Sequence, residues 1–275
     1  MPKVLISDKL SEDAVRIFRD NNIEVDFQPG LGKEPERLAE IIGGYEGLAV
    51  RSATKATADL IARADNLKVI GRAGIGVDNI DLPAASARGI VVMNTPFGNS
   101  ITTAEHAIAM MFALARQIPS ADRSTQEGKW EKSRFMGVEV TAKTLGVVGC
   151  GNIGSVVAAR GIGLKMKVIA YDPFLSVSRA QELGVEKIED VEDLLARADF
   201  VTLHLPKTEK TANLLSAERI AKMKPGARLI NCARGGLVDE AAVAQALKSG
   251  ALAGAAFDVF ETEPANENPL FGLPN

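Results

Sequence analysis

The chain has 275 residues, 46% of them hydrophobic, which is enough for two domains of ordinary size, each with its own core. Its formal charge of −3 at pH 7 is close to balance and its basic residues are dispersed, so neither nucleic acid nor a membrane surface is an expected partner. No apolar run approaches the roughly 18 residues of a membrane span, and residues 1–8 lack the apolar segment of a secretory signal. Cys150 and Cys232 lie in apolar, strand-like surroundings and are interpreted as free thiols, so we expect a cytoplasmic protein.

The first part of the chain alternates short apolar runs with amphipathic segments. The apolar runs predict strands at 4–7, 23–27, 47–51, 67–71 and 90–93. Helices are predicted from residue 11, at 35–42, at 57–64, and from Asp81, a suitable N-cap before an early proline. Apolar strands that alternate with helices predict a parallel sheet covered on both faces.

A long, mostly apolar segment at 101–118 predicts one helix that connects two domains. The polar segment 119–143 then carries Trp130 and Phe135 among charged residues, which indicates an exposed arm. Large aromatic residues on such an arm either contact a second copy, giving a homodimer or homotetramer, or pack against their own chain.

A glycine-rich turn, Gly149-x-Gly151-x-x-Gly154, follows the apolar run at 145–148. In a strand–turn–helix unit the first glycine permits the turn, the second lets a pyrophosphate approach the helix N-terminus, and the third brings helix and strand together. The next predicted strand, 167–172, ends in Asp172, about twenty residues on, where a carboxylate can bind both ribose hydroxyls. No arginine follows at 173–175 to accept a 2′-phosphate, so the predicted cofactor is NAD and not NADP.

The rest of the chain completes a second alternating series. Helices are predicted at 177–183, 191–197, 217–223 and 239–248, and strands at 200–205, 228–232 and 255–260. The predicted fold is therefore α/β, with two doubly wound parallel-sheet (Rossmann-like) domains and a cleft between them. Ligands of such sheets bind beyond the carboxyl ends of the strands, so the following loops are the expected site of chemistry.

Several of these loops carry residues suited to chemistry. Arg72 lies in a glycine-rich loop that could hold an anion through N–H groups and the guanidinium, or could be a plain tight turn. Arg234 follows the strand at 228–232, near the expected position of the nicotinamide, and residues 258–264 supply carboxylates at the next strand end. No metal site is predicted.

Five motifs lie in these loops: Arg72-Ala-Gly-x-Gly-Val-Asp-Asn79, Asn94-Thr-Pro96, Gly149-x-Gly-x-x-Gly154, Asn231-Cys-Ala-Arg-Gly-Gly236 and Asp258-Val-Phe-x-x-Glu-Pro264. Together they closely resemble the D-2-hydroxyacid dehydrogenase family, and the similarity runs from end to end. Residues 50–55, 128–130 and 134–137 resemble those members of the family that act on 3-phosphoglycerate.

The resemblance implies a substrate-binding domain at 1–97, completed in the family by a returning carboxyl-terminal segment, and an NAD-binding domain at 98–275. It implies oxidation of 3-phospho-D-glycerate to 3-phosphohydroxypyruvate, the first step of L-serine biosynthesis. It assigns catalysis to Arg234, which would bind the substrate's carboxylate and 2-oxygen, and to Glu263, which would raise the pKa of a catalytic histidine. The implied substrate contacts are Arg51, Ser52, Arg72, Gly74, Gly76 and, with Lys132 as an alternative, Arg134 from across a dimer. The implied cofactor contacts are Ile75, Gly149, Gly151, Asn152, Ile153, Gly154, Asp172, Leu205, Cys232, Ala233, Arg234 and Asp258.

The sequence departs from the family pattern at its end. The family's catalytic histidine lies in a Pro-His motif shortly after an Asn that follows Leu-Pro, and here the sequence stops at Leu273-Pro-Asn275. His106 is expected to be a structural residue of the connecting helix and His204 to shape a loop by the cofactor. We therefore expect a piece of a longer dehydrogenase that binds NAD but turns over about 10² to 10⁴ times more slowly without its base. The alternatives are another D-2-hydroxyacid dehydrogenase, such as a glyoxylate or hydroxypyruvate reductase, and a non-catalytic NAD-sensing scaffold.

Overall fold

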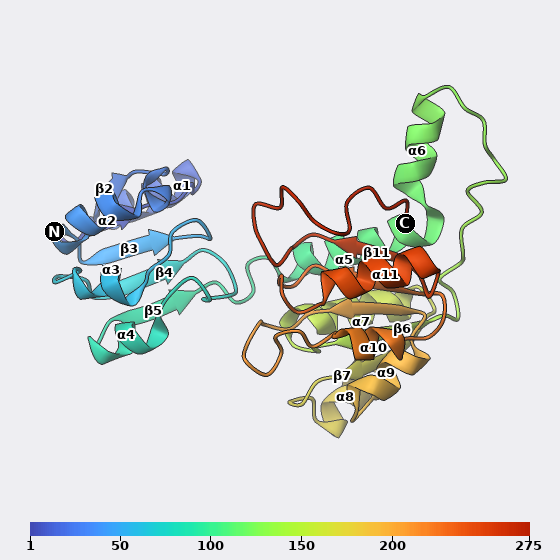
Figure 1. The fold of residues 1–275 in the computed structure, drawn as a ribbon. Helices are drawn as coiled ribbons and strands as arrows, with labels where there is room; N and C mark the ends of the chain where they lie inside the picture. The colour runs from blue at the N-terminus through green and yellow to red at the C-terminus, as the bar shows by residue number, and fades with distance from the viewer. The chain divides into compact units, whose positions relative to one another are not determined.

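The computed structural model describes residues 1–275, which form two compact units, Met1–Asn99 and Ser100–Asn275 (Figure 1). Each unit contains one sheet in which every pair of neighbouring strands is parallel. The predicted fold class, α/β with two Rossmann-like parallel sheets, is confirmed. None of the helices combines the length and the apolar character needed to traverse a bilayer.

The first unit is built on a five-stranded sheet of order β2-β1-β3-β4-β5. Because β1 lies between β2 and β3, the order of the strands reverses there, and the loops after β1 and β3 leave the sheet at that reversal. The elements are β1 (Lys3–Ile6), α1 (Glu12–Asp20), β2 (Glu24–Phe27), η1 (Leu31–Lys33), α2 (Pro35–Ile41), η2 (Ile42–Gly44), β3 (Gly47–Val50), α3 (Ala58–Ala62), β4 (Val69–Arg72), α4 (Leu82–Ala87) and β5 (Val91–Asn94).

Successive residues of β1 face opposite sides of this sheet, as the period of a strand requires. Leu5 joins Leu48 in the larger apolar cluster with residues of α2, α3 and α4. Val4 and Ile6 join a smaller cluster with Val15 of α1. The sheet is therefore buried on both faces, which explains the unbroken apolar runs in the sequence.

The second unit is built on a six-stranded sheet of order β11-β10-β9-β6-β7-β8. The strand order reverses between β6 and β9, so the glycine-rich turn after β6 leaves the sheet beside this reversal. The elements are α5 (Ser100–Arg116), α6 (Ile118–Gln126), β6 (Thr144–Val148), α7 (Asn152–Gly163), β7 (Lys167–Tyr171), α8 (Val177–Leu183), β8 (Glu186–Lys187), α9 (Val191–Arg197), β9 (Phe200–Leu203), α10 (Ala217–Ala221), β10 (Ala227–Asn231), α11 (Glu240–Ser249) and β11 (Leu252–Phe257).

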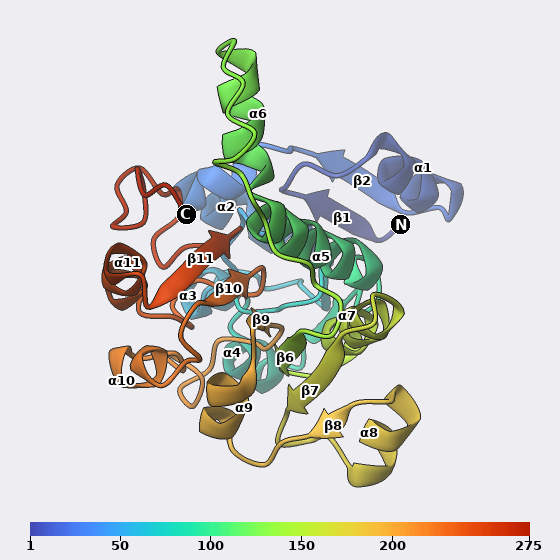
Figure 2. The same ribbon diagram turned by 90° about the vertical axis from the view of Figure 1, so that its right-hand side faces the viewer.

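Two apolar clusters cover the two faces of this sheet. Leu145 and Val147 of β6 pack with buried residues of α5, α7 and α8. Val148 of the same strand packs with residues of α9, α10 and α11. Figure 2 shows α5 and α7 on one side of the sheet and α10 and α11 on the other.

The helix predicted at 101–118 is present as α5 but ends at Arg116, and a second helix, α6, forms the beginning of the segment that we expected to be an arm. Gln117 takes a left-handed conformation with φ of 53°, and α6 begins at the next residue with Pro119 in its first turn. Pro119 has no N–H to donate to the carbonyl oxygen of Ala115, four residues earlier, so α5 cannot continue through it, whereas a proline fits the first turn of a new helix. In both views α6 stands out from the rest of the second unit (Figures 1 and 2).

The sequence also missed two features of the second sheet. β8 is only two residues long, Glu186–Lys187, and its residues are polar. β11 runs over Leu252–Phe257 and not over 255–260, because Gly254 and its alanine neighbours lack the side chains that indicate a strand.

Candidate active site

The glycine-rich turn between β6 and α7 has the geometry of a phosphate cradle. Gly149 has φ of 89°, and a Cβ there would lie 2.5 Å from the carbonyl oxygen of His204. A Cβ on Gly154 would lie 2.0 Å from the carbonyl oxygen of Gly149, so no side chain fits where α7 passes β6. A Cβ on Gly151 would meet no atom within 4 Å. This glycine therefore leaves open space at the N-terminus of α7, where backbone N–H groups attract an anion.

Asp172, directly after β7, is held against the same turn. Its Oδ2 accepts a hydrogen bond from the backbone N–H of Cys150 at 2.8 Å, and its Oδ1 accepts one from the N–H of Phe174 at 2.8 Å. The open space at Gly151 and the fixed carboxylate both fit NAD, since α7 would hold the pyrophosphate and Asp172 the ribose hydroxyls.

The two thiols near this turn are free, as expected from the sequence, and both are buried. Burial, with a smaller contribution from the charge of Asp172, raises the pKa of Cys150 to about 11. Burial also raises the pKa of Cys232 to about 12, and the Cys232 Sγ lies 3.2 Å from the Met110 Sδ. Both thiols are therefore neutral at physiological pH and do not act as nucleophiles.

Arg234 lies in the loop after β10, which Asn231 braces at both ends. The Asn231 Nδ2 donates to the carbonyl oxygen of Arg234 at 3.0 Å, and its Oδ1 accepts the N–H of Ala233 at 3.1 Å. The Arg234 Nη1 donates to the carbonyl oxygen of Ala233 at 2.7 Å. Asn231 is 1% exposed, and sequence reasoning assigned it no role because its partners are backbone groups of its own loop.

The structure brings the loop of Arg234 against the loop that carries Glu263. A Cβ on Gly235 would lie 1.8 Å from the carbonyl oxygen of Phe260, so the two backbones touch there. The Oε1 of Glu263 accepts the N–H of Phe260 at 3.0 Å. The two residues that the sequence assigns to catalysis thus lie on loops in direct contact, beyond the ends of neighbouring strands β10 and β11.

The two histidines have different surroundings. The His204 Nε2 lies 2.8 Å from the Thr202 Oγ1, and burial lowers the pKa of His204 to about 4, so its ring is neutral at pH 7. Its Nδ1 is buried without a partner. His106 was expected to be a structural residue, but its side chain is 47% exposed and its Nε2 lies 3.5 Å from the Oδ1 of Asp258.

The candidate substrate residues of the first unit lie on loops that are bound to one another. The Asn79 Nδ2 donates to the carbonyl oxygen of Arg51 at 2.8 Å, and the Arg72 Nε donates to the same oxygen at 3.4 Å. The Arg72 Nη1 also donates to the carbonyl oxygen of Gly76, and the N–H of Thr95 donates to the carbonyl oxygen of Gly74 at 3.0 Å. The structure therefore brings Arg51 and Arg72 together, with Ser52 and the glycines in the same loops.

Asp8 supports this arrangement and was missed in the sequence. It is 2% exposed, and its carboxylate accepts the N–H of Arg51 at 2.5 Å, the N–H of Thr54 at 3.2 Å and the Thr54 hydroxyl at 2.8 Å. A buried carboxylate is stable only with such donors, and here they come from the loop after β3. The position of this acid, directly after the apolar run predicted as a strand at 4–7, could have indicated that Asp8 belongs to the site.

Arg134 lies on the arm after α6. It donates to the Glu131 carboxylate at 3.0 and 3.1 Å, and its guanidinium lies 5.3 Å from the centre of the Phe135 ring. The base of the arm is bound to α5 by the N–H of Val138, which donates to the carbonyl oxygen of Ala115 at 2.8 Å.

Comparison with known proteins shows which family this chain is similar to. Residues 108–275 match the family described as D-isomer specific 2-hydroxyacid dehydrogenase, NAD binding domain. The chain is 51% identical over 274 residues to the D-3-phosphoglycerate dehydrogenase of Archaeoglobus fulgidus, which covers 99% of this chain and 51% of the relative. A crystal structure of a protein from Thermus thermophilus has a TM-score of 0.91 and 36% identity, over 99% of this chain and 86% of that one. D-lactate dehydrogenase from Aquifex aeolicus, solved with NAD and lactic acid, has a TM-score of 0.82 and 30% identity, over 94% and 77% of the two chains.

The second sheet, with its glycine turn and the carboxylate after β7, defines a dinucleotide-binding domain of the Rossmann type. The chain belongs to the D-isomer specific 2-hydroxyacid dehydrogenase family, and the residues that match its NAD-binding domain all lie in the second unit. The resemblance inferred from the five motifs is thereby confirmed. The chain spans about half the length of the curated relatives it matches.

Proposed function

We propose that the protein is an NAD-dependent dehydrogenase that oxidises 3-phospho-D-glycerate to 3-phosphohydroxypyruvate, the first step of L-serine biosynthesis, in the cytoplasm. The observation that carries this proposal is the contact of Gly235 with Phe260, because it sets Arg234 and Glu263 on adjoining loops of the sheet that bears the glycine turn. The names of the relatives, D-3-phosphoglycerate dehydrogenase at 47–51% identity, support the choice of substrate.

Arg234 and Glu263, the two residues of the second unit assigned to catalysis, have different roles in this reaction. Arg234 binds the carboxylate and the oxygen on C2, and its charge stabilises that oxygen as the hydroxyl proton leaves. Bound NAD supplies the acceptor for the hydride from C2. Glu263 supports the base that takes the proton. His204, which is buried and has its pKa lowered to about 4, does not suit that task.

The phosphate of the substrate is assigned to the first unit. Arg51 and Arg72 supply positive charge, and the N–H groups of the loop that contains Gly74 and Gly76 supply further donors for a phosphate. Ser52 adds a hydroxyl. In a dimer, Arg134 of a second copy would contribute another guanidinium.

The arm after α6 supports a homodimer or homotetramer. Trp130 is 86% exposed, Met136 is 77% exposed, and Ile118 of α6 is 51% exposed. Large apolar side chains left this exposed on one projecting segment are typical of an interface. Sedimentation velocity tests this: Trp130→Ser should shift the protein toward monomer, whereas a wild-type chain that sediments as a monomer would contradict the oligomer.

The function is tested by NADH formation by the full-length protein with 3-phospho-D-glycerate, D-glycerate and D-lactate in parallel. We expect the phosphorylated acid to have the highest kcat/KM, and Arg51→Met to lower that value at least about tenfold while changing the others little. Equal values for phosphorylated and unphosphorylated acids would contradict the substrate and favour another hydroxyacid dehydrogenase. NAD binding without NADH formation from any of them would favour the scaffold.

A further inference from the structure

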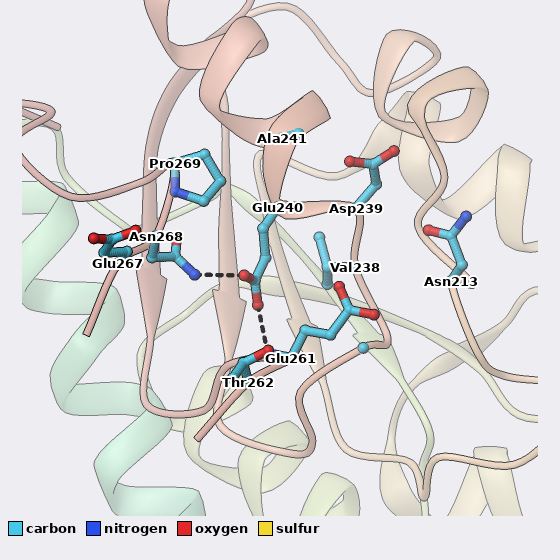
Figure 3. Close-up of a pocket in the computed structure, with 11 residues that line it drawn as sticks. Asn213, Val238, Asp239, Glu240, Ala241, Glu261, Thr262, Glu267, Asn268 and Pro269 are labelled. Carbon is cyan, nitrogen blue, oxygen red and sulfur yellow. Dashed lines mark hydrogen bonds between the residues drawn. The ribbon is translucent and has the colours of Figure 1, made fainter. Parts of the chain in front are cut away.

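A buried carboxylate at the start of α11 has no part in the reaction proposed above. Glu240, the first residue of that helix, is 8% exposed. Its Oε1 accepts the backbone N–H of Glu261 at 2.8 Å, and its Oε2 accepts the Asn268 Nδ2 at 2.5 Å, as Figure 3 shows. A carboxylate this well buried is stable only because both oxygens are hydrogen-bonded.

The two donors come from the two sides of the loop that follows β11. Glu261 lies before Glu263 and Asn268 lies after it, so Glu240 binds the loop on both sides of the residue assigned to catalysis. Asn268 is itself oriented, because its Oδ1 accepts the N–H of Leu270 at 3.0 Å. Turning its amide over to suit another partner would break that bond.

Apolar packing holds the two ends of this loop, since the Phe260 ring lies 6.2 Å from the Phe257 ring and 5.6 Å from the Phe271 ring. The residues between those ends are in a different position. A cavity of about 530 Å³ lies between α11 and the loop, and Gly236, Asp239, Thr262 and Glu267 are among its lining residues (Figure 3). Glu261, Thr262 and Glu267 are exposed. Because residues 261–267 border open space on one side, hydrogen bonds are needed beside the packing of the aromatic rings, and Glu240 accepts two of them, from Glu261 and Asn268.

We propose that Glu240 is a positioning residue for Glu263. Its carboxylate closes the loop around Glu263, so that this side chain is presented in one place to the base of the reaction. The inference rests on the proposed function only in the task given to Glu263; the hold on the loop stands on the structure itself.

The test exchanges donor and acceptor across the Glu240–Asn268 contact. Glu240→Gln keeps the shape of the side chain, and its oxygen can still accept the Glu261 N–H, but its new amide then faces the amide of Asn268. Adding Asn268→Asp restores the contact, because the new carboxylate accepts from that amide and still accepts the N–H of Leu270. The double variant also has the formal charge of the wild type. Glu267→Gln, on the same cavity, is the matched control.

We expect Glu240→Gln to lower kcat for 3-phospho-D-glycerate at least about tenfold with little change in the KM for NAD, because a displaced supporting group affects the chemical step more than cofactor binding. Hydrogen exchange of residues 258–270 should be faster in that variant without substrate. Both effects should be reversed in the double variant and absent in Glu267→Gln.

Unchanged kcat and exchange in Glu240→Gln would overturn the proposal, as would a loss of kcat that the double variant does not recover. If Glu240→Gln fails to fold, Asn268→Ala removes one of the two bonds from a half-buried side chain, and unchanged kcat there would also overturn it. A wild type that oxidises none of the acids would refute the proposed function alone, since the exchange measurement still reports whether Glu240 holds the loop.

Discussion

Replacing Gly151 by alanine should leave the stability of the fold almost unchanged while weakening the binding of NAD. A Cβ on Gly151 would meet no atom within 4 Å, so the substitution creates no clash in the protein itself. Alanine is a poorer N-cap than glycine, which destabilises the fold, but it also restricts the unfolded chain, which stabilises the fold. Each effect changes the free energy of unfolding by less than about 1 kcal/mol. We therefore expect a Tm within a few degrees of the wild type.

The same methyl group would project into the space assigned to the pyrophosphate of NAD. Moving the phosphates away from the N-terminus of α7 would lengthen charge-assisted hydrogen bonds, each contributing about 1.5–3 kcal/mol, so the Kd for NAD should rise about 10- to 100-fold per bond lost. Titration of NADH fluorescence and thermal denaturation measure the two effects on one sample.

Two other glycines serve as controls for this substitution. Gly163→Ala, in the same helix, also meets no atom within 4 Å and should stabilise the fold by about 1 kcal/mol without changing the Kd. Gly154→Ala would place a Cβ 2.0 Å from a carbonyl oxygen and should destabilise the fold. If Gly151→Ala bound NADH as tightly as the wild type, the cradle would not hold the pyrophosphate.

Three further predictions concern single groups of the two units. Asp172→Ser should weaken NAD binding about tenfold or more and narrow the preference for NAD over NADP, because the charge that repels a 2′-phosphate is removed; equal Kd ratios before and after the change would disprove it. Asp8→Asn should lower the free energy of unfolding of the first unit, measured in urea, by about 2–3 kcal/mol. The carboxylate accepts hydrogen bonds with both oxygens, from the N–H of Arg51 and from the N–H and hydroxyl of Thr54, whereas an amide has only one oxygen that can accept. Cys150 and Cys232, with pKa values raised to about 11 and 12, should react slowly with iodoacetamide in the native protein at pH 8 and faster as the pH rises toward those values; rapid native alkylation at pH 8 would contradict their burial.

The sequence predicted the parts of the structure that depend on local pattern. The apolar runs located both sheets, and the spacing of Gly149, Gly151 and Gly154 located the turn, because each glycine answers a local steric need. The break at Gln117 was missed although Pro119 signals it, because the apolar pattern continues across the break.

The supporting residues of the site were beyond the reach of such patterns. Asp8 binds the loop after β3, 43 positions away at Arg51, and Glu240 binds Asn268, 28 positions away. The assembly of the whole sheet decides which backbone group a buried carboxylate contacts. Patterns in a single sequence do not show which residues, far apart along the chain, come into contact. The open space beside Gly151 likewise exists only once α7 has packed on β6.

Transfer of deuterium from C2 of the substrate tests the central claim most directly. The full-length protein would be incubated with NAD and 3-phospho-D-glycerate deuterated at C2, and the NADH analysed by mass spectrometry. Hydride transfer beside Arg234 predicts NADH with one deuterium from the D-acid and no NADH from the L-acid. Unlabelled NADH, or equal formation of NADH from both enantiomers, would contradict the account.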